Sequence, residues 1–169
     1  ITPTAYSSWN NEAISFIPDG SADADDVTIQ LNSFNGGGYH VSAPYQSTST
    51  NYSGWSFFAN YHNGGAGAIY LGKADDISII GEDIQNCTEG ISLSDCGGDL
   101  EIVRCNILAR TMGIWLSGCD FNSSTAAQVY NNIVRMNGYN QYNPNYDSNA
   151  YGIAVQNSND VFLAHNTVD

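Results

Sequence analysis

Short runs that alternate apolar and polar residues recur along the later part of the chain at a regular spacing. Each run is a small residue followed by two apolar residues that flank a variable one, the period-2 pattern of a short strand with one buried face. The runs lie at 68–71, 90–93, 113–116 and 152–155. Their isoleucines are 22, 23 and 39 residues apart, so a unit of 22 or 23 residues repeats and one copy carries an insertion.

A second apolar run and a turn residue follow each first run. The second runs are 77–79, 100–102, 128–130 and 161–163, and the turn residues are Asp83, Asn106, Asn132 and Asn166. Asn and Asp tolerate left-handed backbone, and an Asn side chain is able to hydrogen-bond to the coils above and below it. Because the unit consists of strands and turns without a helical pattern, it predicts an all-β chain.

Stacked coils are the arrangement that suits such a unit, since one coil cannot bury its apolar residues alone but neighbours share one interior column. A β-sandwich would instead show independent hairpins with two-residue turns. We therefore predict a β-solenoid in which residues 1–65 form the N-terminal cap and first irregular coils and residues 66–169 form regular coils of one continuous domain. Residues 43–65 and 136–149 are interpreted as long excursions from the coils. The sequence ends on a strand-and-turn phrase without a polar cap, which we interpret as a solenoid that continues or is covered by another chain.

The Gly-Ile-x-Leu strands, the Asn turn and the phrases at 129–134 and 163–168 resemble the right-handed parallel β-helix superfamily, the pectate-lyase-like fold. The resemblance covers residues 66–169 and concerns the architecture rather than a subfamily. It implies a calcium-assisted lyase site, in which carboxylates hold Ca²⁺ against a uronate and an Arg or Lys accepts a proton. The catalytic candidates are Arg104, Arg135 and Asp83, in a polysaccharide lyase or a glycoside hydrolase; the alternative is that they are solvated turn residues and inter-coil ion pairs.

Charge is sparse and strongly acidic, with 17 Asp and Glu against four Lys and Arg and a net charge of −13. Such a surface repels phosphate backbones, which argues against a nucleic-acid partner, and it repels acidic polysaccharides unless a cation bridges the two. No apolar run approaches the roughly 20 residues of a membrane span, so membrane insertion is not expected. Few lysines and many Tyr and Asn residues favour an extracellular, secreted or surface location.

Two small clusters suggest a cofactor or a cross-link. Asp23, Asp25 and Asp26 offer hard oxygen ligands for Ca²⁺, although they lack the spacing of an EF-hand loop and also fit a solvated loop. Cys96 and Cys119 both follow a strand isoleucine by five residues, which places them on adjacent coils about 4.8 Å apart, close enough for a disulfide. Small residues stacked at an internal corner are the alternative for this pair.

Aromatic residues in the two excursions favour sugar binding, because flat rings stack on the CH faces of sugars and amides bind their hydroxyls. The glycan-binding candidates are Tyr139, Asn140, Tyr142, Tyr146, Asp147 and Trp55. Packing or assembly explains these residues equally well. The leading hypothesis is an extracellular module that recognises polysaccharide or a cell-surface glycan and extends to processing it. The alternative is a structural subunit of a filament, fibre or virion spike, a homo-oligomer that stacks through open β-helix ends without catalysis.

Overall fold

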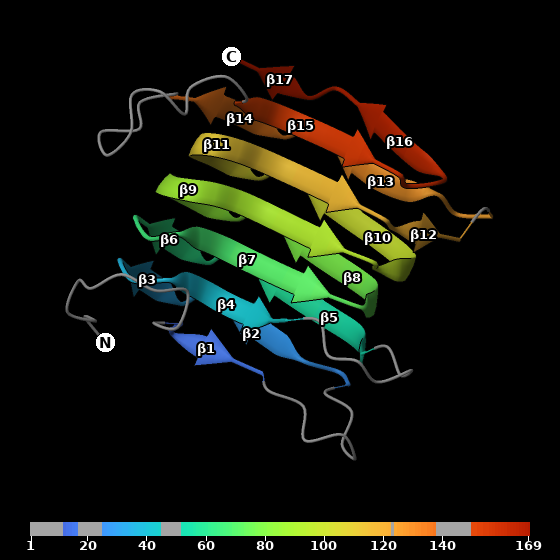
Figure 1. Cartoon of the computed structure of the whole chain (residues 1–169), viewed down its shortest axis with the longest axis horizontal. Coiled ribbons are helices and arrows are strands. Elements are labelled where there is room, and N and C mark those ends of the chain that lie inside the picture. The colour runs from blue at the N-terminus through green and yellow to red at the C-terminus, as the bar shows by residue number, and fades with distance from the viewer. Residues whose placement is uncertain (1–11, 17–24, 45–51, 123, 138–149) are drawn as a thin grey trace.

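A computed structural model describes residues 12–16, 25–44, 52–122, 124–137 and 150–169. These residues form a right-handed parallel β-solenoid whose coils stack from the N-terminal to the C-terminal end (Figure 1). All pairings between the described strands are parallel. In chain order the strands are β1 (Ile14–Ser15), β2 (Thr28–Gln30), β3 (Ser33–Asn35), β4 (Tyr39–Ala43), β5 (Tyr52–Phe58), β6 (Tyr61–Asn63), β7 (Gly67–Gly72), β8 (Ala74–Ile80), β9 (Asp83–Ser94), β10 (Gly97–Val103), β11 (Asn106–Ser117), β12 (Asp120–Phe121), β13 (Ala127–Tyr130), β14 (Ile133–Met136), β15 (Tyr151–Gln156), β16 (Val161–Ala164) and β17 (Thr167–Val168).

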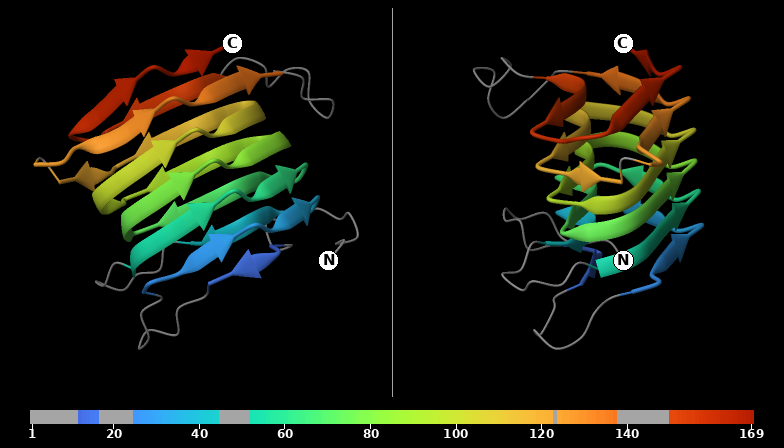
Figure 2. Two further views of the ribbon diagram at one scale, coloured as in Figure 1. Left: turned by 180° about the vertical axis from the view of Figure 1, so that it is seen from behind. Right: turned by 90° about the vertical axis from the view of Figure 1, so that its right-hand side faces the viewer.

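The strands form a seven-stranded and a ten-stranded sheet that together enclose the core. The seven-stranded sheet runs β16-β13-β10-β8-β5-β2, with β12 beside β10, and lies at the front in the left view of Figure 2. The ten-stranded sheet turns a corner within the long strands β9 and β11. The first part of β9 pairs with β6 and its later part pairs with β7. Each coil therefore presents three outer faces, as the right view of Figure 2 shows.

The register confirms the predicted repeat. Two rows of apolar residues pair along the stack, Ile69, Ile91, Ile114 and Ile153 in one and Ile84, Ile107, Val134 and Val168 in the other. Within β9, Ile91 and Leu93 face inward with 0% and 1% of their surface exposed, while Ser92 lies between them on the outer side. Burying one such aliphatic side chain contributes about 1.5–3 kcal/mol, so the interior column holds the coils together.

Residues 52–63 are part of a regular coil, so the prediction of an excursion over 43–65 was wrong for this segment. β5 pairs with β8 and β6 pairs with β9. Trp55 pairs with Ile77, and Phe57 pairs with Ile79, inside the core. The aliphatic repeat did not reveal this coil because large aromatic rings occupy its inward positions.

The predicted asparagine ladder exists, but two of its members were misaligned by one residue. Because Asp83 pairs with Asn106 and Asn106 pairs with Ile133, the position before each strand is occupied by Glu82 and Cys105 in the middle coils rather than by Asp83 and Asn106. The ladder consists of Asn32, Asn60, Glu82, Cys105, Asn132 and Asn166. The Asn132 amide shows its role, since its Nδ2 donates to the Ile102 carbonyl and its Oδ1 accepts from the Cys105 N–H, both at 2.9 Å.

The last coil exposes residues that belong to the core rows. Val155, Leu163 and Val168 are 39%, 48% and 54% exposed, because among the described strands none pairs with the far edges of β15, β16 and β17.

The described residues also contain no helix that is long and apolar enough to cross a membrane.

Candidate functional site: a groove on the seven-stranded sheet

The outer side of the seven-stranded sheet carries a row of polar residues. Ser56, Ser78, Glu101 and Gln128 pair with one another in successive strands β5, β8, β10 and β13. Side chains alternate between the two faces of a strand, so burial of Ile102 fixes Glu101 on the outer side. The packing of the core thus aligns these polar groups along the stack.

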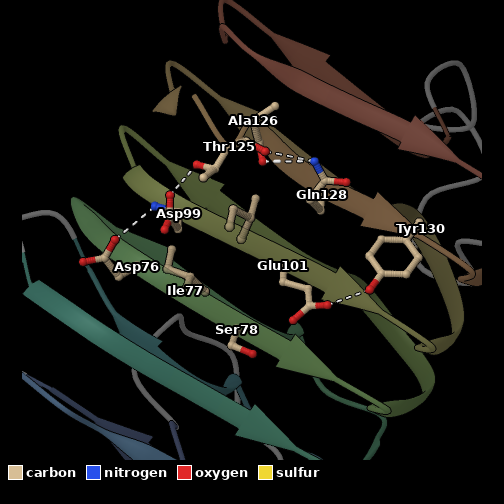
Figure 3. A pocket seen from close by; sticks show the side chains of 10 residues that line it. Asp76, Ile77, Ser78, Asp99, Glu101, Thr125, Ala126, Gln128 and Tyr130 are labelled. Atoms are coloured by element: carbon tan, nitrogen blue, oxygen red, sulfur yellow. Dashed lines mark hydrogen bonds between the residues drawn. The ribbon is translucent and has the colours of Figure 1, made fainter. Parts of the chain in front are cut away.

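A groove of about 530 Å³ surrounds this row (Figure 3). Most of its lining side chains are polar, and the outer face of strands β8 and β10 forms its floor. The lining residues are Asp76, Ile77, Ser78, Asp99, Leu100, Glu101, Thr125, Ala126, Gln128 and Tyr130. A groove that gathers several polar side chains is a candidate site for a small molecule or an oligomer.

One end of the groove is a fixed pair of carboxylates, Asp76 and Asp99 (Figure 3). Asp76 accepts hydrogen bonds from the Asp99 N–H at 3.0 Å and from the Ser53 hydroxyl at 2.9 Å. The Thr125 hydroxyl donates to Asp99 Oδ1 at 2.5 Å. A Cβ on Gly98 would lie 2.5 Å from Asp76 Oδ1, so glycine at 98 leaves room for the Asp76 carboxylate that accepts from the Asp99 N–H.

The other end of the groove holds Glu101 and Tyr130. The Tyr130 hydroxyl donates to Glu101 Oε1 at 2.7 Å. This hydrogen bond raises the pKa of Tyr130, because loss of the proton would place two negative oxygens in contact. At neutral pH the groove therefore presents a phenol ring, a carboxylate and the Gln128 amide side by side.

The groove is acidic, but its carboxylates do not converge on one point. Among the described residues no group of three His, Cys, Asp or Glu side chains is arranged to hold a metal ion. Of the proposed calcium ligands, Asp23 lies outside the described residues. Asp25 accepts a hydrogen bond from the Ser53 N–H at 2.9 Å, and Asp26 adopts left-handed backbone with φ of 56°. These two aspartates help to fix the first coil against the second.

Two of the three predicted catalytic residues lie away from the groove's polar row, whereas Arg104 is near enough for its charge to act on Tyr130 of the groove. Asp83 and Arg135 are joined through Asn106, whose Nδ2 donates to Asp83 Oδ1 at 2.9 Å and whose Oδ1 accepts from Arg135 Nη2 at 2.7 Å. Both belong to the ten-stranded sheet. Arg104 is an exposed left-handed turn residue after β10, and it forms no hydrogen bond or ion pair with either of them. The structure therefore brings two of the three together.

The predicted sugar-binding aromatics divide into two groups. Trp55 is 1% exposed and packs in the core with its ring 6.1 Å from that of Phe57, so it offers no face to a sugar and the prediction for it was wrong. The other candidates, Tyr139, Asn140, Tyr142, Tyr146 and Asp147, lie outside the described residues.

The cysteines are buried free thiols in this structure. Cys96 and Cys119 occupy equivalent corners, as predicted, where their thiols donate to the Leu71 and Leu93 carbonyls at 3.5 and 3.6 Å. The neighbouring Cys96 thiol lowers the pKa of Cys119 because it can donate to a thiolate there. Burial raises the pKa of Cys87 and of Cys105 to about 12.

Thiol titration distinguishes stacked thiols from a bridge. We expect all four cysteines of the unreduced protein to react with a thiol reagent after denaturation, whereas Cys87 and Cys105 stay unreactive in the folded protein because a buried thiol is neither ionised nor accessible. Two reactive thiols in the denatured chain, restored to four by a reductant, would instead show a disulfide.

A second outward cluster escaped the sequence reasoning and lies on the ten-stranded sheet. Tyr39, Gly67 and Glu89 pair in register on β4, β7 and β9. A Cβ on Gly67 would lie 2.2 Å from the Tyr39 ring, so the ring crosses this glycine, and its hydroxyl donates to Glu89 Oε2 at 2.5 Å. Burial raises the pKa of Glu89. The sequence signal would have been a glycine whose equivalent positions in the preceding and following coils both carry a long polar residue.

Comparison with known proteins adds no relative. No family model, no curated protein and no solved structure matches the chain.

Proposed function

We propose that the groove binds a segment of polysaccharide, in an extracellular protein that presents glycan-binding groups on a parallel β-helix as the pectate-lyase-like superfamily does. The observation that carries this proposal is the alignment of Ser78, Glu101, Gln128 and Tyr130 on successive strands around one groove. A surface or secreted protein meets such polymers, and the sparse lysine content agrees with that location.

The chemistry of the groove suits sugars. Carboxylate and amide oxygens accept from sugar hydroxyls, the Gln128 amide and the Ser78 hydroxyl also donate, and the phenol ring of Tyr130 offers an apolar face. Neighbouring strands are about 4.8 Å apart, so the row repeats on the length scale of one sugar unit in an extended chain. An elongated ligand lying along the stack would therefore meet similar groups at each coil.

Charge narrows the class of glycan. Asp76, Asp99 and Glu101 form no ion pair with the described cationic residues, so the groove favours neutral or amino sugars. A uronate polymer would need a bridging cation such as Ca²⁺. We therefore expect Ca²⁺ to be required for the binding of acidic glycans only.

Hydrolysis of the bound glycan would require two carboxyl groups beside one glycosidic bond. Asp99 and Glu101 are two residues apart along β10, which sets their Cα atoms roughly 6.6 Å apart. They are the pair best placed for hydrolysis in the groove, whereas Asp83 and Arg135 are the candidates for a lyase on the ten-stranded sheet.

Binding is tested by titrating the protein with a panel of neutral, amino-sugar and uronate oligosaccharides, with and without Ca²⁺. We expect Glu101→Gln to weaken binding tenfold or more, because a hydrogen bond to a charged group contributes about 1.5–3 kcal/mol. Asp83→Asn is the matched control, since it removes one carboxylate on the other sheet. Equal affinity of the Glu101 variant and the wild type would contradict the groove, and loss in the Asp83 variant alone would move the site to the ten-stranded sheet.

Assembly is a second candidate function, favoured by the exposed core residues of β15, β16 and β17. We propose that a β-coil of another copy stacks on this edge, because its free backbone groups and apolar rows match those that join the internal coils. Light scattering over a range of concentrations tests it: Leu163→Asp should shift an oligomer to monomer, and a monomeric wild type at all concentrations would contradict stacking.

A further inference from the structure

Three polar residues form a connected chain inside the N-terminal coils. Glu82, His62 and His40 are 0%, 0% and 1% exposed. Glu82 Oε2 lies 2.9 Å from His62 Nε2, and His62 Nδ1 lies 3.1 Å from His40 Nδ1. The Phe34 ring stacks on both imidazoles, with centroids 5.6 Å from His40 and 5.0 Å from His62. Water therefore has little access to any member of the chain.

The hydrogen bonds define where the protons lie. Asn60 donates to Glu82 Oε1 through its N–H and its Nδ2, each at 3.1 Å. With Glu82 Oε2 as the acceptor, His62 donates to it through Nε2 and accepts at Nδ1. The Nδ1–Nδ1 contact then needs one proton, which His40 supplies.

The connected side chains of Glu82, His62 and His40 therefore accommodate one added proton but not two. A first added proton still leaves one N–H and one acceptor at the Nδ1–Nδ1 contact. A second proton on His40 would leave two N–H groups facing each other at the 3.1 Å contact, with two cationic rings stacked in the core. His40 Nε2 has no hydrogen-bond partner in the described structure, and only the Gly36 backbone nearby favours a charged His40.

We propose that Glu82, His62 and His40 form an acid-sensitive switch that holds the coils of β3, β4 and β6 together at neutral pH and loosens them when His40 gains a proton. The other groups that face the chain do not offset this charge. Asn60 and Phe34 are uncharged, the Cys105 thiol beside Glu82 is neutral because burial raises its pKa to about 12, and the Gly36 backbone beside His40 opposes the effect only in part.

The direction of the pH dependence follows from His40. Burial, aided by the charge of His62, lowers the pKa of His40 from 6.5 to about 4. The unfolded chain therefore binds more protons than the folded one between these values. Stability is fully present above pH 6.5 and is lost as the pH falls from 6.5 towards 4.

The test compares melting temperatures between pH 7.5 and 4 for the wild type, His40→Asn and His165→Asn. Asn at 40 retains a donor near the place of Nδ1 but cannot be protonated, while His165 is an exposed histidine in a left-handed turn that asparagine tolerates. We expect acid to lower the wild-type melting temperature by roughly 10 °C more than that of the His40 variant. The His165 variant should follow the wild type, and parallel pH profiles of wild type and His40→Asn would overturn the proposal.

Histidine NMR on the wild type keeps the proposal falsifiable if His40→Asn does not fold. We expect the buried His40 resonances to stay neutral down to about pH 4, and hydrogen exchange at pH 5 to accelerate in β3, β4 and β6 before β10 and β13. Titration of His40 near 6.5 in the folded protein, or uniform acceleration of exchange along the solenoid, would overturn it.

Discussion

Replacing Gly113 with alanine is expected to lower the free energy of unfolding by about 3 kcal/mol, the upper part of the range for an overpacked core. The added Cβ would lie 2.3 Å from Val134 Cγ1 and 2.4 Å from the Gly152 carbonyl oxygen. Gly113 belongs to the row of small inward residues beside the strand isoleucines, where the backbone of the next coil approaches closely. Hydrogen bonds fix the spacing of the coils, so the stack has to open locally to admit a methyl group.

Chemical denaturation of Gly113→Ala, with Gly36→Ala as a control, measures this effect. A Cβ on Gly36 meets nothing within 4 Å, but the residue has a φ of 65°, so its alanine variant reports backbone strain without crowding. We expect that control to cost about 1 kcal/mol. Adding Val134→Ala should recover part of the loss in Gly113→Ala, as a coupled pair would. A Gly113 variant as stable as the wild type would contradict close coil packing at this row.

Most of the fold was predictable because its signal is local. Four residues are enough to predict a strand and its buried face, as at 90–93. There an inward isoleucine lies between a small residue and an outward variable one. The coil of Trp55 and Phe57 was missed because the same inward positions accept aromatic rings of very different shape. Register, rather than the pattern of any one coil, identifies these residues as core.

The ladder shows why residue type alone misaligned two coils. Asp83 and Asn106 looked like ladder members, but the position requires a side chain that reaches the neighbouring coil's backbone. Glu82 meets part of that requirement as an acceptor, and Cys105 meets part as a donor to the Ile79 carbonyl at 3.7 Å. Glu82 and Cys105 take the place of asparagine in the ladder, and only the pairing of Asp83 with Asn106 shows that they occupy this position.

The groove could not be predicted from the sequence for a related reason. Ser78, Glu101 and Gln128 are far apart in the chain and become neighbours only through the register of β8, β10 and β13. The catalytic candidates were chosen by residue type, and Asp83 and Arg135 share Asn106 as a hydrogen-bond partner on the ten-stranded sheet rather than in the groove. Tyr130 was visible as a strand residue, but its hydrogen bond to Glu101 depends on the side chains' reach across one coil.

Replacing Glu82 with alanine is expected to lower the free energy of unfolding at neutral pH by about 3–5 kcal/mol, because three buried donors lose their acceptor and each such loss costs about 1–3 kcal/mol. The change leaves the Asn60 N–H, the Asn60 amide and His62 Nε2 without their acceptor in the core. Urea unfolding measures the loss. Asp83→Ala is the control, because the adjacent carboxylate bonds to Gln85 and Asn106 on the half-exposed side, where we expect a loss of about 1 kcal/mol or less. Equal losses in the two variants would contradict the buried chain.

Glu82→Asn separates the two roles of this residue. Asparagine occupies the same ladder position at 60, 132 and 166, so it should restore the inter-coil hydrogen bonds and lose less stability than alanine does. It cannot reproduce the charge that faces His62. If Glu82→Asn matches the wild type at pH 7 but loses its acid sensitivity, the carboxylate serves the proton-binding chain rather than the fold. If it is as unstable as Glu82→Ala, the hydrogen bond between Glu82 and His62 is what the N-terminal coils require, and the asparagine ladder is incidental at this coil.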